Sequence, residues 1–316
     1  MKKIFLISFP RSGSTLLQRL LMTNTKIISS NEPWFLLWLF SYNKEDLLVA
    51  KYKHRGLVSA MKQNEINYMS DKDSFKKNLK NFANQYYESL SNDTEAYFLD
   101  KTPNYIFILE DIIRTFENSK FIFLSRNPLA IAASTSNAWS QNRIQFSQYH
   151  YLFKDGFKIF SETIRENENK IHLINYEKLT ENPQYELSKI QSYLDLNDLF
   201  NVDMLQKSTL QGSMGDMGLK KTFDKNEIKR NDSWIKFYNS VYRRAWAKSF
   251  LKKIGKENLI TMGYNYDDLI SKMNRNKSYR LISFQDIYGF ILFLMYEFVR
   301  KVRFREIFSS YNSENK

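Results

Sequence analysis

The stretch Ile4-Phe-Leu-Ile-Ser-Phe-Pro-Arg-Ser-Gly-Ser-Thr-Leu-Leu17 decides the fold, because it predicts a strand, a tight turn and a helix start in direct succession. Residues 4–9 are apolar apart from one serine, which is typical of a buried strand. Leucines with helical spacing follow the turn. The first N–H groups of such a helix have no partner within it, and its dipole adds positive potential. The stretch therefore predicts an anion-binding site.

The turn itself has the residue types that phosphate binding requires. Gly13 lets the backbone approach a ligand closely, Arg11 adds a cation, and Ser14 and Thr15 add hydroxyl groups. The Walker A pattern G-x-x-x-x-G-K-[ST] is not met, because Ser14 stands where the lysine would follow Gly13. The cation lies two residues before the glycine instead. An ordinary strand-to-helix turn with a surface arginine is the alternative.

A second strand-to-helix junction lies further along the chain. Lys120–Ser125 reads as a buried strand, and Arg126 follows at once. Asn127 and Pro128 are typical of an N-cap and a first helical residue. Ser134 then falls about two turns into the helix. An arginine and a serine so arranged can hold a dianionic phosphate; otherwise Arg126 merely follows the strand and Ser134 faces solvent.

These two junctions resemble the cofactor site of sulfotransferases that use 3′-phosphoadenosine 5′-phosphosulfate (PAPS). Pro10-Arg-Ser-Gly-Ser-Thr-Leu-Leu17 resembles their 5′-phosphosulfate loop. Leu124-Ser-Arg-Asn-Pro128, with Ser134, resembles their 3′-phosphate site. The resemblance implies that one set of residues binds PAPS and its product 3′,5′-ADP: Arg11, Ser12, Gly13, Ser14, Thr15, Arg126, Ser134 and Lys221.

Lys221 belongs to an irregular segment, residues 205–234, which is rich in glycine and lysine. A basic loop at this stage closes over the nucleotide in many sulfotransferases, so Lys221 is predicted near the 3′-phosphate or the adenine. The alternative is a flexible surface loop.

Weaker resemblances extend over residues 1–265. Asn31-Glu-Pro-Trp-Phe35 places Glu32 where carbohydrate sulfotransferases often have an acidic residue. Asp100-Lys-Thr-Pro-Asn-Tyr105 resembles the Glu-Lys-Thr-Pro segment of heparan-type enzymes, with Asp in place of Glu. Ile171–Leu179 resembles the family's Tyr-Glu-Asp-Leu strand, although Lys178 stands where Asp is usual.

The resemblance implies catalytic roles for three residues. Glu32 is expected to take the acceptor's proton as a general base, while Arg11 and Lys101 stabilise the departing 3′,5′-ADP. Only Lys101 can also donate a proton, because the arginine pKa is above about 12. The alternative is that Glu32 and Lys101 are ordinary surface charges.

The order of elements predicts the fold class. Strands are expected at Lys3–Ser8, Ile27–Ser29, Tyr97–Leu99, Lys120–Ser125 and Ile171–Asn175. Helices are expected at Thr15–Met22, Ile106–Phe116, Pro128–Gln141, Gln148–Glu166 and Gln184–Leu194, and another from Trp234 through Trp246 and Phe250. This alternation predicts a parallel sheet with helices on both faces. The resemblance implies the same, a P-loop-like three-layer α/β/α sandwich.

One sulfotransferase domain is predicted over residues 1–270, followed by a basic, aromatic C-terminal extension over 271–316. Residues 44–92 form a polar helical insertion, which either shapes the acceptor pocket or is a solvated cover. Within the segment 281–308, the run 287–296 is too short to span a bilayer and is followed by clustered cations. Three interpretations remain for it: peripheral contact with anionic lipid, a helix docked on the body, or a dimer contact.

Composition narrows the partners. The chain has 316 residues, a net charge of +13 and no cysteine. The charge favours a nucleotide, an acidic glycan or an anionic membrane. No nucleic-acid-binding motif is present, so no nucleic acid is expected. The three histidines lack metal-ligand spacing, so no metal is expected. The sequence does not predict an oligomeric state.

The N-terminal residues bear on the cellular location of the protein. Lys2-Lys3 and six apolar residues resemble the start of a signal peptide, but the run is shorter than the 7–15 residues expected. We expect a bacterial cytoplasmic enzyme, with the inner membrane face as a peripheral location.

The predicted function is transfer of a sulfuryl group from PAPS to an acceptor hydroxyl on a carbohydrate or glycolipid. Two alternatives are a P-loop-type phosphotransferase or kinase and a non-catalytic, membrane-associated nucleotide-binding protein. A kinase would need a Walker lysine and a magnesium-binding Asp at a strand end, where Arg126 stands.

Overall fold

The computed structural model describes residues 1–44, 54–69, 71, 74–90, 96–144, 152–207, 210, 228, 232–275 and 281–312. The chain divides into two compact units. The first comprises Met1–Ser125 and Glu162–Arg230, and the second comprises Arg126–Ser161 and Asn231–Lys316.

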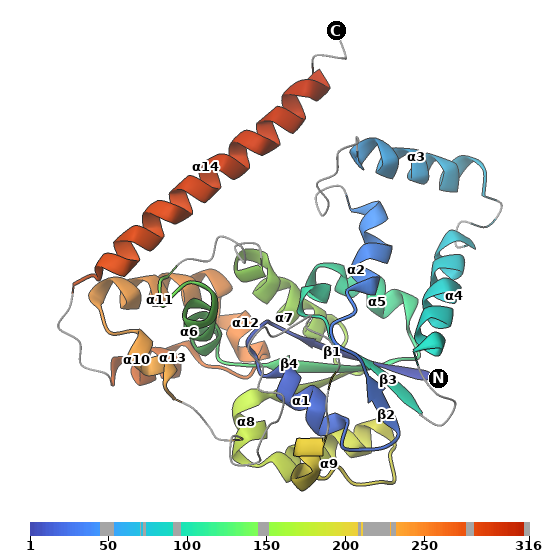
Figure 1. Ribbon diagram of the computed structural model, residues 1–316, viewed down its shortest axis with the longest axis horizontal. Helices are drawn as coiled ribbons and strands as arrows, with labels where there is room; N and C mark the ends of the chain where they lie inside the picture. Colours follow the sequence, from blue (N-terminus) through green and yellow to red (C-terminus); the bar gives the residue numbers. More distant parts are fainter. Residues whose placement is uncertain are drawn as a thin grey trace. The chain divides into compact units, whose positions relative to one another are not determined.

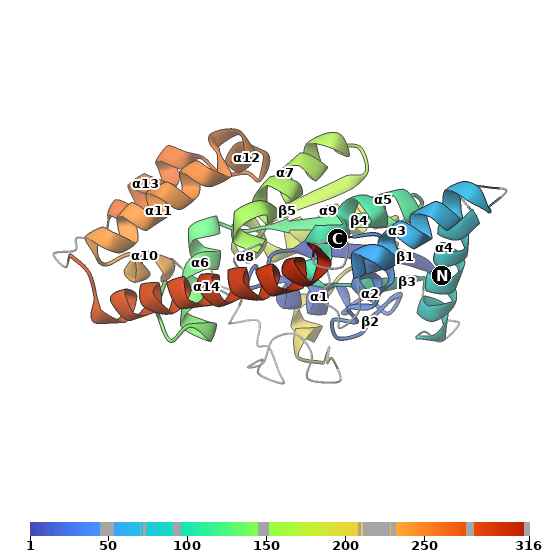
Figure 2. The same cartoon turned by 90° about the horizontal axis from the view of Figure 1, so that it is seen from above.

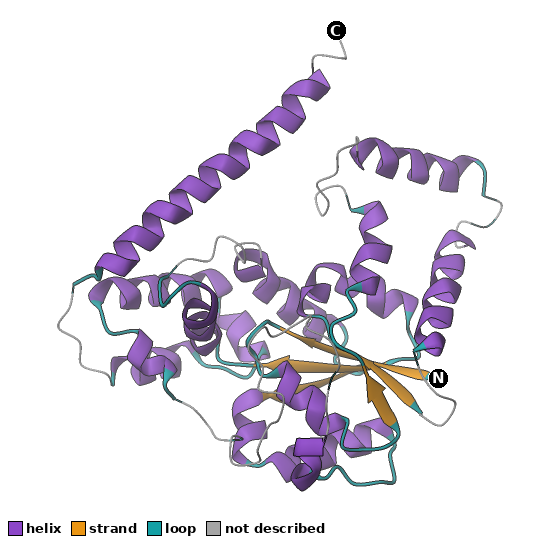
Figure 3. Ribbon diagram, viewed as in Figure 1, coloured by secondary structure: helices purple, strands orange, loops and turns teal. Residues whose placement is uncertain are grey.

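The first unit is built on a five-stranded parallel sheet (Figures 1 and 3). Its strands are β1 Lys2–Ser8, β2 Ile27–Ser29, β3 Tyr97–Asp100, β4 Lys120–Ser125 and β5 Ile171–Asn175. The order across the sheet is β2-β3-β1-β4-β5, and every neighbouring pair is parallel. The strand predictions are confirmed to within one residue. The chain progresses to opposite sides of β1, so the carboxyl end of β1 is the switch point at which such sheets bind ligands.

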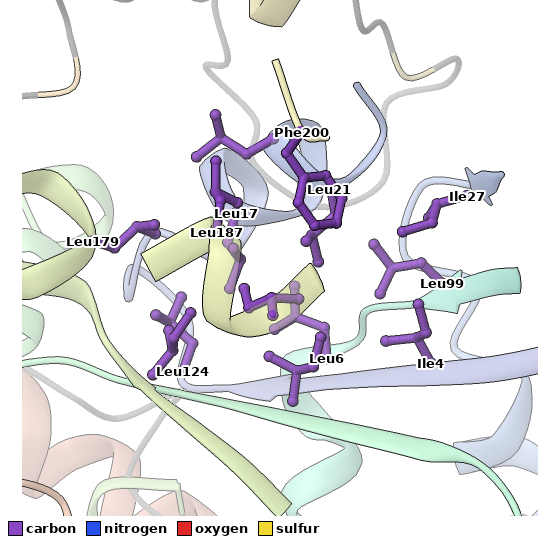
Figure 4. Packing of buried hydrophobic residues seen from close by; sticks show 14 of the residues in the cluster. Ile4, Leu6, Leu17, Leu21, Ile27, Leu99, Leu124, Leu179, Leu187 and Phe200 are labelled. Atoms are coloured by element: carbon purple, nitrogen blue, oxygen red, sulfur yellow. The ribbon is translucent and has the colours of Figure 1, made fainter. Parts of the chain in front are cut away.

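Side chains of β1 alternate between two apolar layers. Ile4 and Leu6 belong to a buried cluster with leucines of α1 (Ser14–Leu21), and with α8 (Tyr176–Glu181) and α9 (Pro183–Leu194) (Figure 4). Phe5 points to the other face, where its ring stacks on Phe121 with centroids 5.6 Å apart. Burial on both faces explains why β1 is a continuous apolar run.

The predicted polar insertion contains two helices, α3 (His54–Asn67) and α4 (Ser74–Ser89). They follow α2 (Phe35–Phe40) and a 3₁₀ turn, η1 (Ser41–Asn43). Helix α4 buries Ala83 and Tyr87, so it packs on the rest of the unit and is not a wholly solvated cover.

The predicted helix Ile106–Phe116 is partly wrong. A 3₁₀ segment, η2 (Pro103–Ile108), comes first, and α5 (Leu109–Thr115) begins only after it. The 3₁₀ segment begins earlier than the predicted helix because Thr102 is extended and Pro103 occupies the first helical position.

The second unit is helical. Its elements are α6 (Pro128–Trp139), the π-helical turn η4 (Leu152–Gly156), the start of α7 (Phe157–Glu166), α10 (Trp234–Phe237), α11 (Val241–Ile254), α12 (Lys256–Thr261), α13 (Tyr266–Asn274) and α14 (Phe284–Asn312). A further 3₁₀ turn, η5 (Val202–Lys207), belongs to the first unit. In Figure 2, α11 and α13 lie side by side. Within the described residues, none of the helices has the length and apolar character needed to cross a membrane.

One helix prediction in this unit is wrong. The helix predicted from Trp234 through Trp246 is interrupted after Phe237, and α11 starts at Val241. The Tyr238 hydroxyl donates to the Leu129 carbonyl of α6 at 2.9 Å. Ser240 caps α11 by accepting from Arg243 N at 3.2 Å. A contact between distant segments and a cap therefore end the helical run.

A buried ion pair attaches α14 to this unit. Arg243 donates Nε–H to Asp286 Oδ2 at 2.8 Å and Nη2–H to Oδ1 at 3.0 Å. Its side chain is 3% exposed and that of Asp286 is 0% exposed. Arg243 also donates to the carbonyls of Phe237 and Asn142, and Asp286 also accepts from Ser283. The pair therefore joins three segments of the unit.

We expect Asp286→Ala to lower the free energy of unfolding by about 3–5 kcal/mol, because Arg243 would remain charged and buried without its partner. Chemical denaturation followed by circular dichroism measures this. The matched control is Arg114→Ala, which breaks an exposed pair with Glu110 and should cost at most about 1 kcal/mol. Equal losses in both variants would contradict the anchoring role of Asp286.

Candidate active site

The turn after β1 adopts an unusual backbone conformation. Arg11 and Gly13 both have left-handed dihedrals, with φ of 63° and 87°. Ser12 N donates to the Phe9 carbonyl at 3.2 Å, which closes the turn. Gly13 is the N-cap of α1, and no side chain caps this helix. The first N–H groups of α1 are therefore available for an anion.

Gly13 is required for a second reason. A Cβ added there would overlap the ring of Tyr176, the first residue of α8, which follows β5. Only glycine combines the left-handed backbone with the space that this ring occupies. Tyr176 lies within the segment Ile171–Leu179 that weakly resembles the family, but no local pattern in that segment predicts its contact with the loop.

Two buried hydroxyl groups lie in this region. Ser8 ends β1 and Ser12 lies in the turn, and both are 0% exposed. Neither hydroxyl oxygen has a hydrogen-bond partner among the described residues. Because buried polar groups are nearly always paired, such hydroxyls indicate a ligand or water. Ser14 and Thr15, also buried, open α1. The chemistry of this loop fits an oxyanion such as a phosphosulfate.

Glu32 and Lys101, predicted separately from the sequence, form an ion pair. Lys101 Nζ donates to Glu32 Oε1 at 2.7 Å, and the side chains are 4% and 10% exposed. Glu32 lies beyond the carboxyl end of β2, and Lys101 directly follows β3. Both strands lie on the same side of β1 in the sheet, with β3 next to β1 and β2 beyond it. The surface-charge alternative is therefore wrong for both residues.

Gln18 of α1 is a site residue that the sequence analysis missed. Its side chain is fully buried and donates to Ser29 Oγ at 2.7 Å and to the Ser30 carbonyl at 2.9 Å. Ser29 in turn donates to the Leu99 carbonyl at 2.6 Å. The helix after the loop is thereby tied to the segment that leads to Glu32. A glutamine among the leucines of α1 is the only sequence signal of this contact.

Asp100, the last residue of β3, precedes Lys101 and fixes the position of the Glu32–Lys101 pair. Its carboxylate is 1% exposed and accepts from the hydroxyl groups of Tyr87 at 2.6 Å and Tyr105 at 3.0 Å. Tyr105 Oη also accepts from Leu36 N, at the start of α2, at 3.2 Å. Burial raises the pKa of Asp100 to about 6, and the hydrogen bonds and the nearby Lys101 charge limit this rise. Asp100 thus connects the strand end of Lys101 to the helix that follows Glu32.

Arg126 and Ser134 belong to the second unit. Arg126 follows the last residue of β4, and Ser134 lies in α6. The predicted cap is confirmed, since Asn127 Oδ1 accepts from Leu129 N at 2.9 Å and Pro128 begins the helix. Arg126 and Ser134 are both half-buried. Lys221 lies outside the described residues, as does most of the segment 205–234.

No group of three or more His, Asp or Glu side chains suited to a metal ion occurs within the part of the chain that the structure describes.

Comparison with known proteins agrees with this arrangement. Residues 3–200 match the model of the sulfotransferase family. Nodulation protein NoeE of Sinorhizobium fredii (strain NBRC 101917 / NGR234) is 30% identical over 135 residues, which is 43% of this chain and 31% of NoeE. The match therefore spans about a third of the length of that relative. The sulfotransferase domain of the Synechococcus PCC 7002 olefin synthase superposes with a TM-score of 0.51 at 21% identity, covering 74% of this chain and 87% of that domain.

The parallel sheet and the loop after β1 define a P-loop-like α/β fold. Because the family model covers more than half of the sequence, the chain belongs to the sulfotransferase family, the transferases that use PAPS. The resemblance noted in the loop and strand motifs is thereby confirmed.

The raised pKa of Asp100 predicts a pH-dependent stability. Between pH 4 and 6 the unfolded chain has this carboxyl charged while the folded chain keeps it protonated. The free energy of unfolding should therefore fall by about 3 kcal/mol as the pH rises through this window. The Asp100→Asn variant lacks this titrating group, so its free energy of unfolding should not show this fall. The difference between the variant and the wild type should therefore change by about 3 kcal/mol in favour of the variant between pH 4 and 7. Urea denaturation at each pH measures the difference, and parallel curves would contradict the assignment.

Proposed function

We propose that this chain transfers a sulfuryl group from PAPS to a hydroxyl group of a carbohydrate or glycolipid. The observation that carries the proposal is the buried Glu32–Lys101 pair, whose residues follow β2 and β3 on one side of β1. The carboxyl end of β1 itself leads into the oxyanion loop. The family match supports sulfuryl transfer. The acceptor, the base and the residue roles are our inference.

The donor would be bound by two groups of residues. The N–H groups at the start of α1, with Arg11, Ser12, Ser14 and Thr15, would bind the 5′-phosphosulfate. Gly13 would let the backbone reach it. We assign the 3′-phosphate to Arg126 and Ser134, on their match to the family motif, and the nucleotide side to Lys221 on its position in a basic segment.

Glu32 would accept the proton of the acceptor hydroxyl as its oxygen attacks sulfur. The new oxygen–sulfur bond forms while the bond from sulfur to the bridging phosphate oxygen breaks, and that electron pair leaves with 3′,5′-ADP. Lys101 has three ammonium protons, of which one bonds Glu32. The others could stabilise the negative charge that grows on the leaving oxygen, together with Arg11.

A carbohydrate acceptor is favoured by the Asn-Glu-Pro and Asp-Lys-Thr-Pro segments, which resemble those of carbohydrate enzymes. The net charge of +13 also suits an acidic glycan. A P-loop phosphotransferase and a non-catalytic nucleotide-binding protein are the competing functions. Their predictions differ in nucleotide preference and in the need for Glu32.

We expect the protein to bind 3′,5′-ADP at least about ten-fold more tightly than ADP, because a charged hydrogen bond to the 3′-phosphate contributes about 1.5–3 kcal/mol. Arg126→Gln should remove this preference and leave ADP binding little changed. Isothermal titration calorimetry measures both. Arg114→Gln, on the exposed surface of α5, is the matched control. Equal affinity of the wild type for the two nucleotides would refute PAPS as donor.

We expect Glu32→Gln to lower kcat by about 10²- to 10⁴-fold, because it keeps the shape of the side chain but cannot accept the proton. Transfer of labelled sulfate from PAPS to glycan and glycolipid extracts measures turnover. Lys101→Met should also lower kcat, and 3′,5′-ADP binding shows whether either variant still folds. Glu110→Gln, an exposed change in α5, is the control. Full turnover in both site variants would refute the catalytic roles, even where nucleotide binding supports the family.

A further inference from the structure

Helix α14 is attached to its own unit along one side. Asp286 is 0% exposed and paired with Arg243. At Gly289 an added Cβ would lie 3.2 Å from Arg143 Cβ, so the helix approaches its own unit closely at this glycine. Tyr288 completes the contact, with its ring centroid 5.2 Å from the Arg143 guanidinium carbon. Asp286 and Gly289 therefore mark the side of α14 that is attached to the second unit.

The opposite side is apolar and exposed. We call six residues the outward face of α14: Phe284, Ile287, Ile291, Leu294, Met295 and Phe298. Their side chains are between 41% and 93% exposed. At about 100° per residue these positions fall within an arc of about 100°, centred roughly opposite Asp286 and Gly289. A contiguous apolar stripe of this kind marks an interaction site.

The helix continues directly into cations. Arg300, Lys301, Arg303 and Arg305 follow the outward face within α14, and only Glu297 and Glu306 accompany them there. The other acidic residue of the helix, Asp286, is neutralised by Arg243. The apolar stripe is therefore continuous with a cationic segment, and its partner must offer both apolar and anionic groups.

An anionic lipid surface meets both requirements. A second copy of this chain would bring four more cations to the contact, with few acidic residues to oppose them. The helix is not able to span a bilayer, but an interfacial helix need only lie in the headgroup region with its apolar side inward. Nearby Lys and Arg then bind anionic headgroups.

We propose that the outward face of α14 binds the surface of an anionic membrane, with residues 300–305 on the lipid headgroups. The inference goes beyond the transfer reaction and does not depend on it. It gives the chain a location at a lipid surface, where the buried Arg243–Asp286 pair holds the helix to the rest of the second unit.

Sedimentation of the full chain with phosphatidylcholine vesicles, with and without phosphatidylglycerol, tests this. We expect binding only with phosphatidylglycerol, and a loss of at least ten-fold from about 0.1 M to about 1 M salt, where the Debye length falls from about 10 Å to about 3 Å. Ile291→Asp/Leu294→Asp/Phe298→Asp should abolish binding. The matched control is Ile260→Asp, at an apolar residue of α12 that is 65% exposed.

A second variant tests the cations separately. Replacing Arg300, Lys301, Arg303 and Arg305 by Gln should weaken binding by about five-fold or more for each cation lost. Lys252→Gln/Lys253→Gln, on the exposed side of α11, should leave most of the binding. Circular dichroism and sedimentation velocity without lipid accompany each variant. The proposal is overturned if the folded wild type does not bind vesicles that contain phosphatidylglycerol. It is also overturned if the triple Asp variant changes a dimer to a monomer but still binds these vesicles.

Discussion

The buried carboxylate of Asp100 is the constraint on which the candidate site depends. Removing a charge from water is costly unless hydrogen bonds compensate, and here Tyr87 and Tyr105 donate to it from two other elements. The Tyr105 hydroxyl also accepts a hydrogen bond from Leu36 N, at the start of α2. The end of β3 and the start of α2 are thereby held together. Lys101 and Glu32, the residues that flank these two points, meet as a consequence.

The loop after β1 is constrained by residues that follow strands on both sides of β1. The Tyr176 ring from the β5–α8 junction leaves no space for a side chain at Gly13. On the other side, Gln18 fastens α1 to the end of β2. An anion site with fixed N–H directions needs such support, because electrostatic stabilisation depends on dipoles that do not have to reorganise during the reaction. The residues that contact the loop are therefore as important to it as the loop residues themselves.

All five strands and the Asn127 cap were predictable because their signals are local: a buried strand is an apolar run, and a cap is an Asn before a Pro. The interruption at Tyr238 was not, because the apolar spacing continues into α11 while the hydrogen bond that ends α10 goes to Leu129. The Glu32–Lys101 pair also depends on a contact between segments that are distant in the sequence. Glu32 and Lys101 could each be predicted from a motif. Their contact could not, because it depends on the order of the strands in the sheet, which no local sequence pattern indicates.

The buried ion pairs Arg243–Asp286 and Lys101–Glu32 differ in how fully their hydrogen-bonding groups are occupied. Asp286 receives two bonds from Arg243 and others from Ser283 and Ile144, so its lone pairs are occupied and any change leaves a buried group unpaired. Among the described residues, a single hydrogen bond joins Lys101 to Glu32. Two ammonium protons and one carboxylate oxygen remain for a ligand. The first pair can only hold structure, whereas the second can exchange partners as a reaction proceeds. That difference, and not burial alone, separates the Arg243–Asp286 pair from the pair to which we assign catalysis.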